Sequence, residues 1–207
     1  MIKRRRQPGL WTFGIVGIFL LGCPLPVSAG AGGPEDRVRD TLESALHILS
    51  DPALQGPEKQ EARRQEVRQL IASRFNYKEM AARSLDGHWA GLTGEQRQEF
   101  VGLFGELFER SYSRMVLDSL LDHQVLYKGE SVNGAEAMVK TILVDKRGDR
   151  LPVDYELRRR NGRWELFDVV IDGVSIVTNY QSQFNRIIRT SSYQTLVKRM
   201  RTKRDEE

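Results

Sequence analysis

The residues best suited to covalent chemistry are Gly173-Val174-Ser175, between an apolar run and a helical pattern. This turn is half of the Gly-x-Ser-x-Gly elbow that exposes a serine nucleophile in acyl-transfer enzymes. Val177 stands where the second glycine would let strand and helix approach closely. We therefore predict that the Ser175 hydroxyl caps a helix by accepting hydrogen bonds from free backbone N–H groups.

The histidines give no convincing metal site. The chain has three of them, His47, His88 and His123. Asp118 and Asp122 precede His123, but no second histidine lies at a spacing that would complete a ligand set. We expect polar side chains at a helix end here, and no metal.

Two carboxylates, Asp168 and Asp172, flank the same glycine turn. Paired carboxylates can perform general acid–base catalysis. However, no nucleophile, phosphate loop or dinucleotide fingerprint accompanies them, so we expect structural hydrogen bonds at a strand end. The sequence thus predicts no catalytic residue and no cofactor.

The N-terminus has the pattern of a secretory signal at residues 1–29. Lys3–Arg6 are basic, Leu10–Leu21 are apolar, and Val27–Ala29 are small residues suited to cleavage. The apolar run is too short for a permanent membrane anchor. An alternative is that Leu20-Leu21-Gly22-Cys23 acts as a lipobox, with lipidation of Cys23 holding the protein at a membrane.

Cleavage after Ala29 changes the charge balance. The whole chain has 32 basic and 28 acidic residues, and the signal holds four of the basic ones and no acidic one. The mature chain, residues 30–207, is then neutral, which argues against nucleic-acid binding. It also loses Cys23, the only cysteine, so neither disulfides nor thiol chemistry are expected.

The mature chain shows helical periodicity first, then strand periodicity, then helical periodicity again. Helices are expected from Glu35, from Glu58, after Asn76 and from Thr93 to about Leu121, the last opened by a Thr93–Gln96 capping box. Period-two patterns predict strands at 123–129, 137–147, 150–160 and 163–172. Two further helices follow Gly173. We expect an α+β fold with a four-stranded antiparallel meander between N-terminal and C-terminal helices.

An aromatic stripe and two basic clusters have more than one explanation. The helix from Thr93 carries an unusually aromatic stripe, which either fills a large core or lines a cavity; periodicity does not separate the two. Basic clusters occur at Arg158–Arg160 and Lys198–Arg204. Solvated faces are the ordinary explanation for them, and local attraction of an anionic head group or an acidic partner is the alternative.

Several segments, in order, resemble the MlaC family, the periplasmic phospholipid shuttle of the lipid-asymmetry (toluene-tolerance) transport system. They are FNYKEMAARSLDGHW, LTGEQRQEFVGLFGELFERSY, LPVDYELRRRNGRWELFDVVIDGVSIVTNYQSQFNRIIR and LVKRMRTK. The likeness covers about residues 35–204. Two departures are Gly94, where the family often has proline, and Gln181, where it often has an arginine.

The resemblance implies a periplasmic carrier that is not an enzyme and has no cofactor. It would bury phospholipid acyl chains in an apolar cavity between the sheet and the helices. Its partners would be an inner-membrane ABC transporter complex, with that complex's substrate-binding membrane component, and an outer-membrane lipoprotein–porin complex. We expect a monomer. The alternatives are a hopanoid or other lipid as cargo, an accessory interaction protein without a ligand, and, remotely, a hydrolase that uses Ser175.

Lipid-lining residues follow from the stripe geometry together with the family's cavity. They are Phe104, Phe108, Tyr112, Met115, Leu151, Val153, Tyr155, Trp164, Val170, Val174 and Val177.

Overall fold

The computed structural model describes residues 32–205, without the side chains of residues 118, 119, 204 and 205. The expected signal at residues 1–29, with Cys23, lies outside the described residues. The α-helices, in chain order, are α1 (Pro34–Ser50), α2 (Gln60–Arg74), α3 (Tyr77–Leu85), α4 (Gly94–Ser119), α5 (Ile176–Thr190) and α6 (Tyr193–Asp205). None of the helices in this part of the chain is long and apolar enough to cross a membrane.

Local sequence signals explain where the helices begin. The predicted capping box of α4 is confirmed: Gln96 N donates to Thr93 Oγ1 (3.2 Å), and Thr93 N donates to Gln96 Oε1 (2.9 Å). Asn76 caps α3 through its Oδ1, which accepts from Glu79 N at 2.9 Å. Helix α2 begins two residues later than expected because Pro57–Lys59 forms a 3₁₀ turn.

The sheet is an antiparallel meander with the order β1-β2-β3-β4-β5. The strands are β1 (His123–Asn133), β2 (Glu136–Asp145), β3 (Arg150–Arg160), β4 (Arg163–Ile171) and β5 (Val174–Ser175). The prediction of four strands missed β5, a two-residue strand. The first strand was expected to end at Gly129, but Gly129 has a φ of +107° at a register shift and the pairing with β2 continues to Asn133. A bulge of this kind bends a strand without ending it.

The turns at the two ends of β4 contain residues with positive φ. Asn161 and Gly162 both have positive φ, 49° and 78°, as a type I′ turn between β3 and β4 requires. At the end of β4, Asp172 and Gly173 have φ of 49° and 79° and reverse the chain into β5. The chain then enters α5 directly.

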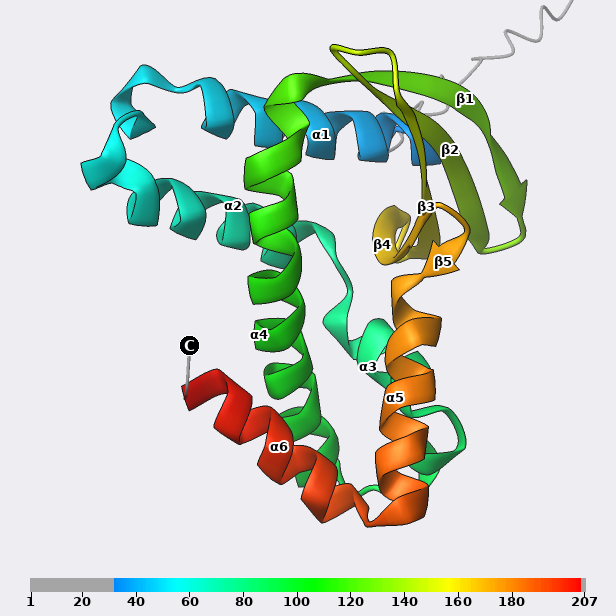
Figure 1. The fold of residues 1–207 in the computed structure, drawn as a ribbon. Coiled ribbons are helices and arrows are strands. Elements are labelled where there is room, and N and C mark those ends of the chain that lie inside the picture. The colour runs from blue at the N-terminus through cyan, green and yellow to red at the C-terminus, as the bar shows by residue number, and fades with distance from the viewer. Residues whose placement is uncertain (1–31, 206–207) are drawn as a thin grey trace, which may run out of the picture. The chain divides into compact units, whose positions relative to one another are not determined.

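Helix α1 lies against the sheet, whereas α3, α5, α6 and the N-terminal half of α4 form a helical cluster beside it (Figure 1). Helix α1 packs on the sheet, and α2 contacts both α1 and α4. Helix α4 runs from this region to α6, which packs on the N-terminal half of α4, while α5 packs on α3 and β4. At the crossing of α3 and α4, a Cβ at Gly105 would lie 2.8 Å from the Tyr77 ring, so glycine permits this close approach.

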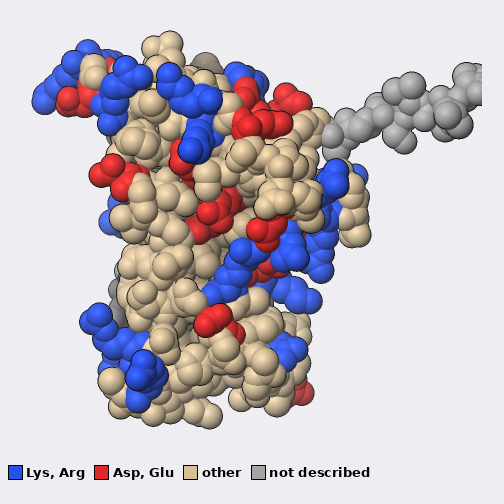
Figure 2. Space-filling view, turned by 90° about the vertical axis from the view of Figure 1, so that its right-hand side faces the viewer, with Lys and Arg blue, Asp and Glu red and all other residues tan. Residues whose placement is uncertain are grey.

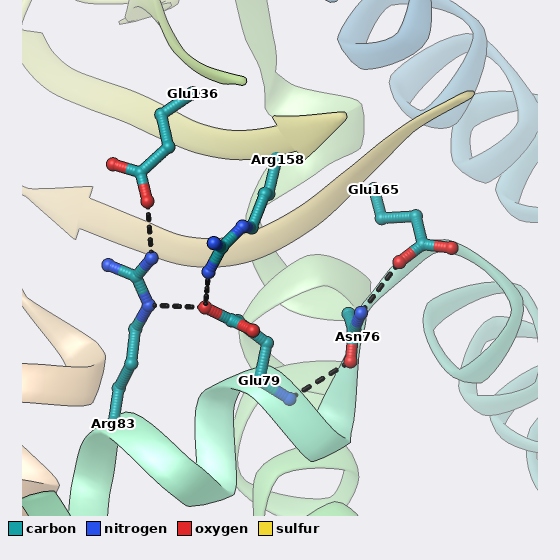
Figure 3. Close-up of polar contacts among 6 residues, drawn as sticks. All are labelled: Asn76, Glu79, Arg83, Glu136, Arg158 and Glu165. Atoms are coloured by element: carbon teal, nitrogen blue, oxygen red, sulfur yellow. Dashed lines mark hydrogen bonds and ion pairs between the residues drawn. The ribbon is translucent and has the colours of Figure 1, made fainter. Parts of the chain in front are cut away.

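A network of polar contacts joins α3 to the sheet (Figure 3). Glu79 accepts hydrogen bonds from Arg83 Nε (2.9 Å) and from Arg158 of β3 (2.5 Å), and Arg83 also pairs with Glu136 of β2 at 2.6 Å. Burial by itself raises the pKa of Glu79, but these arginine contacts outweigh it and hold the pKa below its ordinary value. Arg158, part of a predicted basic cluster, is therefore engaged within the fold.

Candidate ligand-binding cavity

A cavity of about 130 Å³ lies between the inner face of the sheet and helices α1, α2 and α4. Aliphatic and aromatic side chains make up nearly all of its wall. The lining residues are Thr41, Leu42, Ala45, Val67, Leu70, Ile71, Phe75, Phe108, Tyr112, Met115, Val116, Leu120, His123, Leu143, Leu151, Val153, Tyr155, Val169, Ile171 and Ile176.

The aromatic stripe of α4 passes from a solid core at one end to the cavity wall at the other. Phe104 is fully buried and packs against Tyr180 and Phe184 of α5, with ring centroids 5.4 and 6.4 Å away. One turn later, Phe108 packs against Phe75 at 5.1 Å, and both side chains line the cavity. Farther along α4, Met115 is 37% exposed and marks a place where the cavity wall reaches solvent.

The polar atoms of the wall are few. Burial raises the pKa of the Tyr155 hydroxyl, and burial together with the nearby Tyr180 and Asp168 raises that of Tyr112. Both phenols therefore stay neutral in the physiological range. His123 lines the cavity at the start of β1. The wall suits an uncharged, flexible apolar group.

Six of the eleven predicted lining residues lie in this wall. They are Phe108, Tyr112, Met115, Leu151, Val153 and Tyr155. Phe104 and Val177 are buried elsewhere, and Trp164 lies beyond the cavity beside Arg159, whose guanidinium carbon is 5.5 Å from the indole. Val174 is 60% exposed, because the Asp172-Gly173 turn directs it to solvent.

A bulge in β4 explains why Val170 does not line the cavity. Leu157 pairs with Leu166 and Glu156 with Asp168, so Phe167 is an extra residue in the ladder. An extra residue reverses the alternation of side chains beyond it. Trp164 and Leu166 therefore share the inner face with Val169 and Ile171 rather than with Val170.

The remaining lining residues were missed by sequence reasoning. Half of them come from α1, α2 and the residue that follows α2, where apolar residues recur at helical spacing: Thr41, Leu42, Ala45, Val67, Leu70, Ile71 and Phe75. The stripes themselves were a usable signal. What the sequence did not show was that a space remains between these helices and the sheet.

Ser175 performs the structural role predicted for it. Its Oγ accepts from Thr178 N at 3.0 Å at the start of α5 and donates to the carboxylate of Asp168. Asp168 also accepts from Val169 N (2.8 Å) and Val177 N (3.1 Å). Burial raises the pKa of Asp168 even though these hydrogen bonds favour its charged form. The Asp168 carboxylate thus fastens β4 to the start of α5.

Neither Asp168 nor Ser175 belongs to the cavity wall. The imidazole of His88 contacts Asn185 Oδ1 at 3.1 Å, and His123 lies in the cavity wall. Within residues 32–205, no cluster of three or more His, Cys, Asp or Glu side chains has the arrangement of a metal site.

Comparison with known proteins gives two results. A family model described as MlaC protein matches residues 39–202. A solved structure of a phospholipid-binding protein from Ralstonia solanacearum, in complex with a phospholipid, matches 84% of this chain and 98% of that chain. The TM-score is 0.73 at 22% sequence identity, which establishes a shared fold.

Proposed function

This chain belongs to the MlaC protein family, and we propose that it binds a phospholipid whose acyl chains occupy the cavity between the sheet and α1, α2 and α4. The observation that carries the proposal is an interior space with an almost wholly apolar wall that contains no Asp, Glu, Lys or Arg. The Ralstonia solanacearum protein, which has this fold, was solved with a phospholipid bound. A binding protein rather than an enzyme fits these features.

The apolar wall provides what an acyl chain lacks in water. Each buried methylene group gains about 0.8 kcal/mol, so a lipid chain strongly prefers the cavity to solvent. Side chains such as Phe108, Met115 and Leu151 make non-directional contacts, which tolerate chains of different length. The phenols of Tyr112 and Tyr155 are neutral, so no charge has to lose its hydration when a hydrocarbon chain packs against them.

The cavity is small for this cargo. About 130 Å³ is below the roughly 300–1,000 Å³ of ordinary ligand pockets. We infer that the walls separate when lipid enters. The chain offers two walls that belong to different layers, the sheet on one side and α1, α2 and α4 on the other. This structure then corresponds to the closed form of the site.

The finer part of the proposal is transport. We propose that the protein is exported, loses its signal at Ala29, and carries lipid through the periplasm between an inner-membrane ABC transporter complex and an outer-membrane complex. The sequence pattern at residues 1–29 and the family support this. The mass of the N-terminal peptide of the mature protein tests the processing step. A peptide that begins at Gly30 would support cleavage after Ala29, whereas a peptide that begins at a lipidated Cys23 would show that the protein is attached to a membrane.

Extraction of the purified mature protein with organic solvent, followed by lipid mass spectrometry, tests the cargo. We expect phospholipid in stoichiometric amount. A hopanoid-type lipid in stoichiometric amount would support a carrier whose cargo is not a phospholipid. Protein that carries no lipid from any native source would favour an accessory interaction protein whose interior is closed.

A further inference from the structure

The C-terminal helices carry an unusual charge distribution. Residues 176–204 contain seven of the chain's 32 basic residues and none of its 28 acidic ones, although acidic residues follow at positions 205–207. The basic residues are Arg186, Arg189, Lys198, Arg199, Arg201, Lys203 and Arg204. The mature chain is close to neutral, so these cations stand apart from the rest of the molecule.

The apolar faces of both helices are already used within the fold. Tyr180 and Phe184 of α5, like Leu196 and Met200 of α6, are buried. The basic side chains project from the other side, where those of α5 and α6 are exposed up to Lys203. Figure 2 shows basic side chains gathered at the lower left edge of the face that it presents.

Most of these cations have no acidic partner. Arg201 pairs with Glu99 of α4. In the described part of the chain, the ion pairs include none with Arg186, Arg189, Lys198, Arg199 or Lys203. Arginines elsewhere are often engaged, as Arg74 is with Asp40 at 2.9 Å and Arg83 with Glu79 and Glu136. Cations without an acidic partner keep their charge available to another molecule.

We propose that the basic hairpin, meaning the exposed cations Arg186, Arg189, Lys198, Arg199 and Lys203, docks the protein on a bilayer surface that contains anionic phospholipids. Clusters of four to eight Lys or Arg on a helix attract such surfaces without insertion. Insertion is not available here, because the apolar side of α6 packs on α4. Docking is therefore electrostatic and reversible.

The chemistry of the hairpin favours lipid head groups over an acidic protein. Protein interfaces rely on buried aromatic or aliphatic anchors at their centre. The exposed large apolar side chains of the described residues are Met115, Leu121, Val132 and Val174, and none of them lies on α5 or α6. A surface that offers charge without an anchor suits a diffuse layer of phosphates.

The hairpin is distant from the cavity, so docking and cargo binding are separable. Helix α6 contacts the N-terminal half of α4, where Tyr193 Oη donates to the Gln96 carbonyl at 3.2 Å. Met115, at the cavity wall, lies nineteen residues farther along the same helix, or about 28 Å at 1.5 Å per residue. A protein held by the hairpin keeps its cavity wall away from the docking face.

Vesicle flotation tests the proposal with the mature protein. We expect binding to vesicles of phosphatidylethanolamine and phosphatidylglycerol, little binding to pure phosphatidylcholine, and release as salt is raised from low to about 0.5 M, where charges are screened within a few ångströms. Absence of binding to the anionic vesicles at low salt would overturn the proposal. Salt-sensitive retention on polyglutamate in that case would identify an acidic protein as the partner.

Variants locate the surface. Lys198→Gln, Arg199→Gln and Lys203→Gln together should lower vesicle binding by about tenfold or more, since each cation adds to the attraction. A matched control removes three exposed cations of β3 and the turn before it, Arg147, Arg150 and Arg160, and should bind nearly as the wild type. Equal losses in both triple variants would show that net charge alone acts. Lipid extracted from either variant should match the wild type, so this test is independent of the cargo proposal.

Discussion

The rings of Phe108 and Tyr112 lie 4.8 Å apart on successive turns of α4, and both line the cavity. One turn earlier, Phe104 stacks on Phe108 with 6.4 Å between centroids but belongs to the solid core. A single aromatic stripe therefore serves two purposes along one helix. Its N-terminal part closes the helical cluster, and its C-terminal part leaves an apolar space under the sheet.

Filling the cavity from the α1 side should remove the cargo. Ala45 is buried and lines the cavity, so Ala45→Phe places a ring in a space of about 130 Å³. We expect the lipid-to-protein ratio after organic extraction to fall to roughly a tenth or less, because the pocket no longer admits a chain. Circular dichroism checks that the variant folds.

The matched control for this change is Val174→Phe. Val174 is 60% exposed and outside the cavity wall, so the same increase in volume should leave the lipid content unchanged. If Val174→Phe empties the protein and Ala45→Phe does not, the cavity described above is not the lipid site.

The Glu79 network should make stability depend on pH. The folded state holds the pKa of Glu79 below its ordinary value of 4.5. The stabilisation is thus present at neutral pH and is lost as pH falls through the folded pKa. Glu79→Gln should cost about 2 kcal/mol of unfolding free energy at pH 7, since it replaces charge-assisted hydrogen bonds. The difference from wild type should narrow as pH falls below 4.5 and close once pH has fallen through the folded pKa of Glu79.

Urea unfolding at several pH values measures this effect. Glu66→Gln is a suitable control, because Glu66 is an exposed residue of α2 that takes no part in the Glu79 network. Its stability should follow the wild type at every pH. A constant deficit for Glu79→Gln from pH 7 to pH 3 would contradict the role of the ionised carboxylate.

Two glycines of α4 should respond in opposite ways to alanine. A Cβ at Gly102 meets open space, so Gly102→Ala should stabilise the protein by up to about 1 kcal/mol through helix propensity. A Cβ at Gly105 would lie 2.8 Å from the Tyr77 ring, and relieving that overlap should cost about 1–3 kcal/mol. Thermal unfolding of the two variants gives the comparison; a rise in Tm for Gly105→Ala would mean that Tyr77 moves freely.

Local sequence signals predicted most of the fold. The Thr93–Gln96 capping box, the Asn161-Gly162 turn and the Ser175 cap each depend on contacts within four residues, so the sequence contains everything they need. The five-stranded meander follows from alternation and turn residues, and only the two-residue β5 was too short to give a period.

The cavity required long-range information. The extra residue Phe167 shifts the alternation of β4, and its position depends on pairing with β3. The space beside Ala45 and Ile71 depends on how closely α1 and α2 approach the sheet, which no periodicity records. Stripes identify which side chains turn inward; the distance between the facing layers decides whether they meet or leave a space.

Ser175, which stands in half of a nucleophile elbow, should prove to be a structural residue. Ser175 Oγ satisfies the Thr178 N–H and donates to Asp168, so Ser175→Ala should cost about 1 kcal/mol, the usual value for an N-cap. Ser175→Thr, which keeps the hydroxyl, should recover most of that loss. Neither variant should change the lipid content, because Ser175 is not part of the cavity wall. Hydrolysis of an ester substrate by the wild-type, Ser175→Ala and Ser175→Thr proteins tests the alternative. An active wild type, an inactive Ser175→Ala and an impaired Ser175→Thr would show that the hydroxyl is a nucleophile. Equal and negligible rates for all three proteins would show that Ser175 only caps the helix.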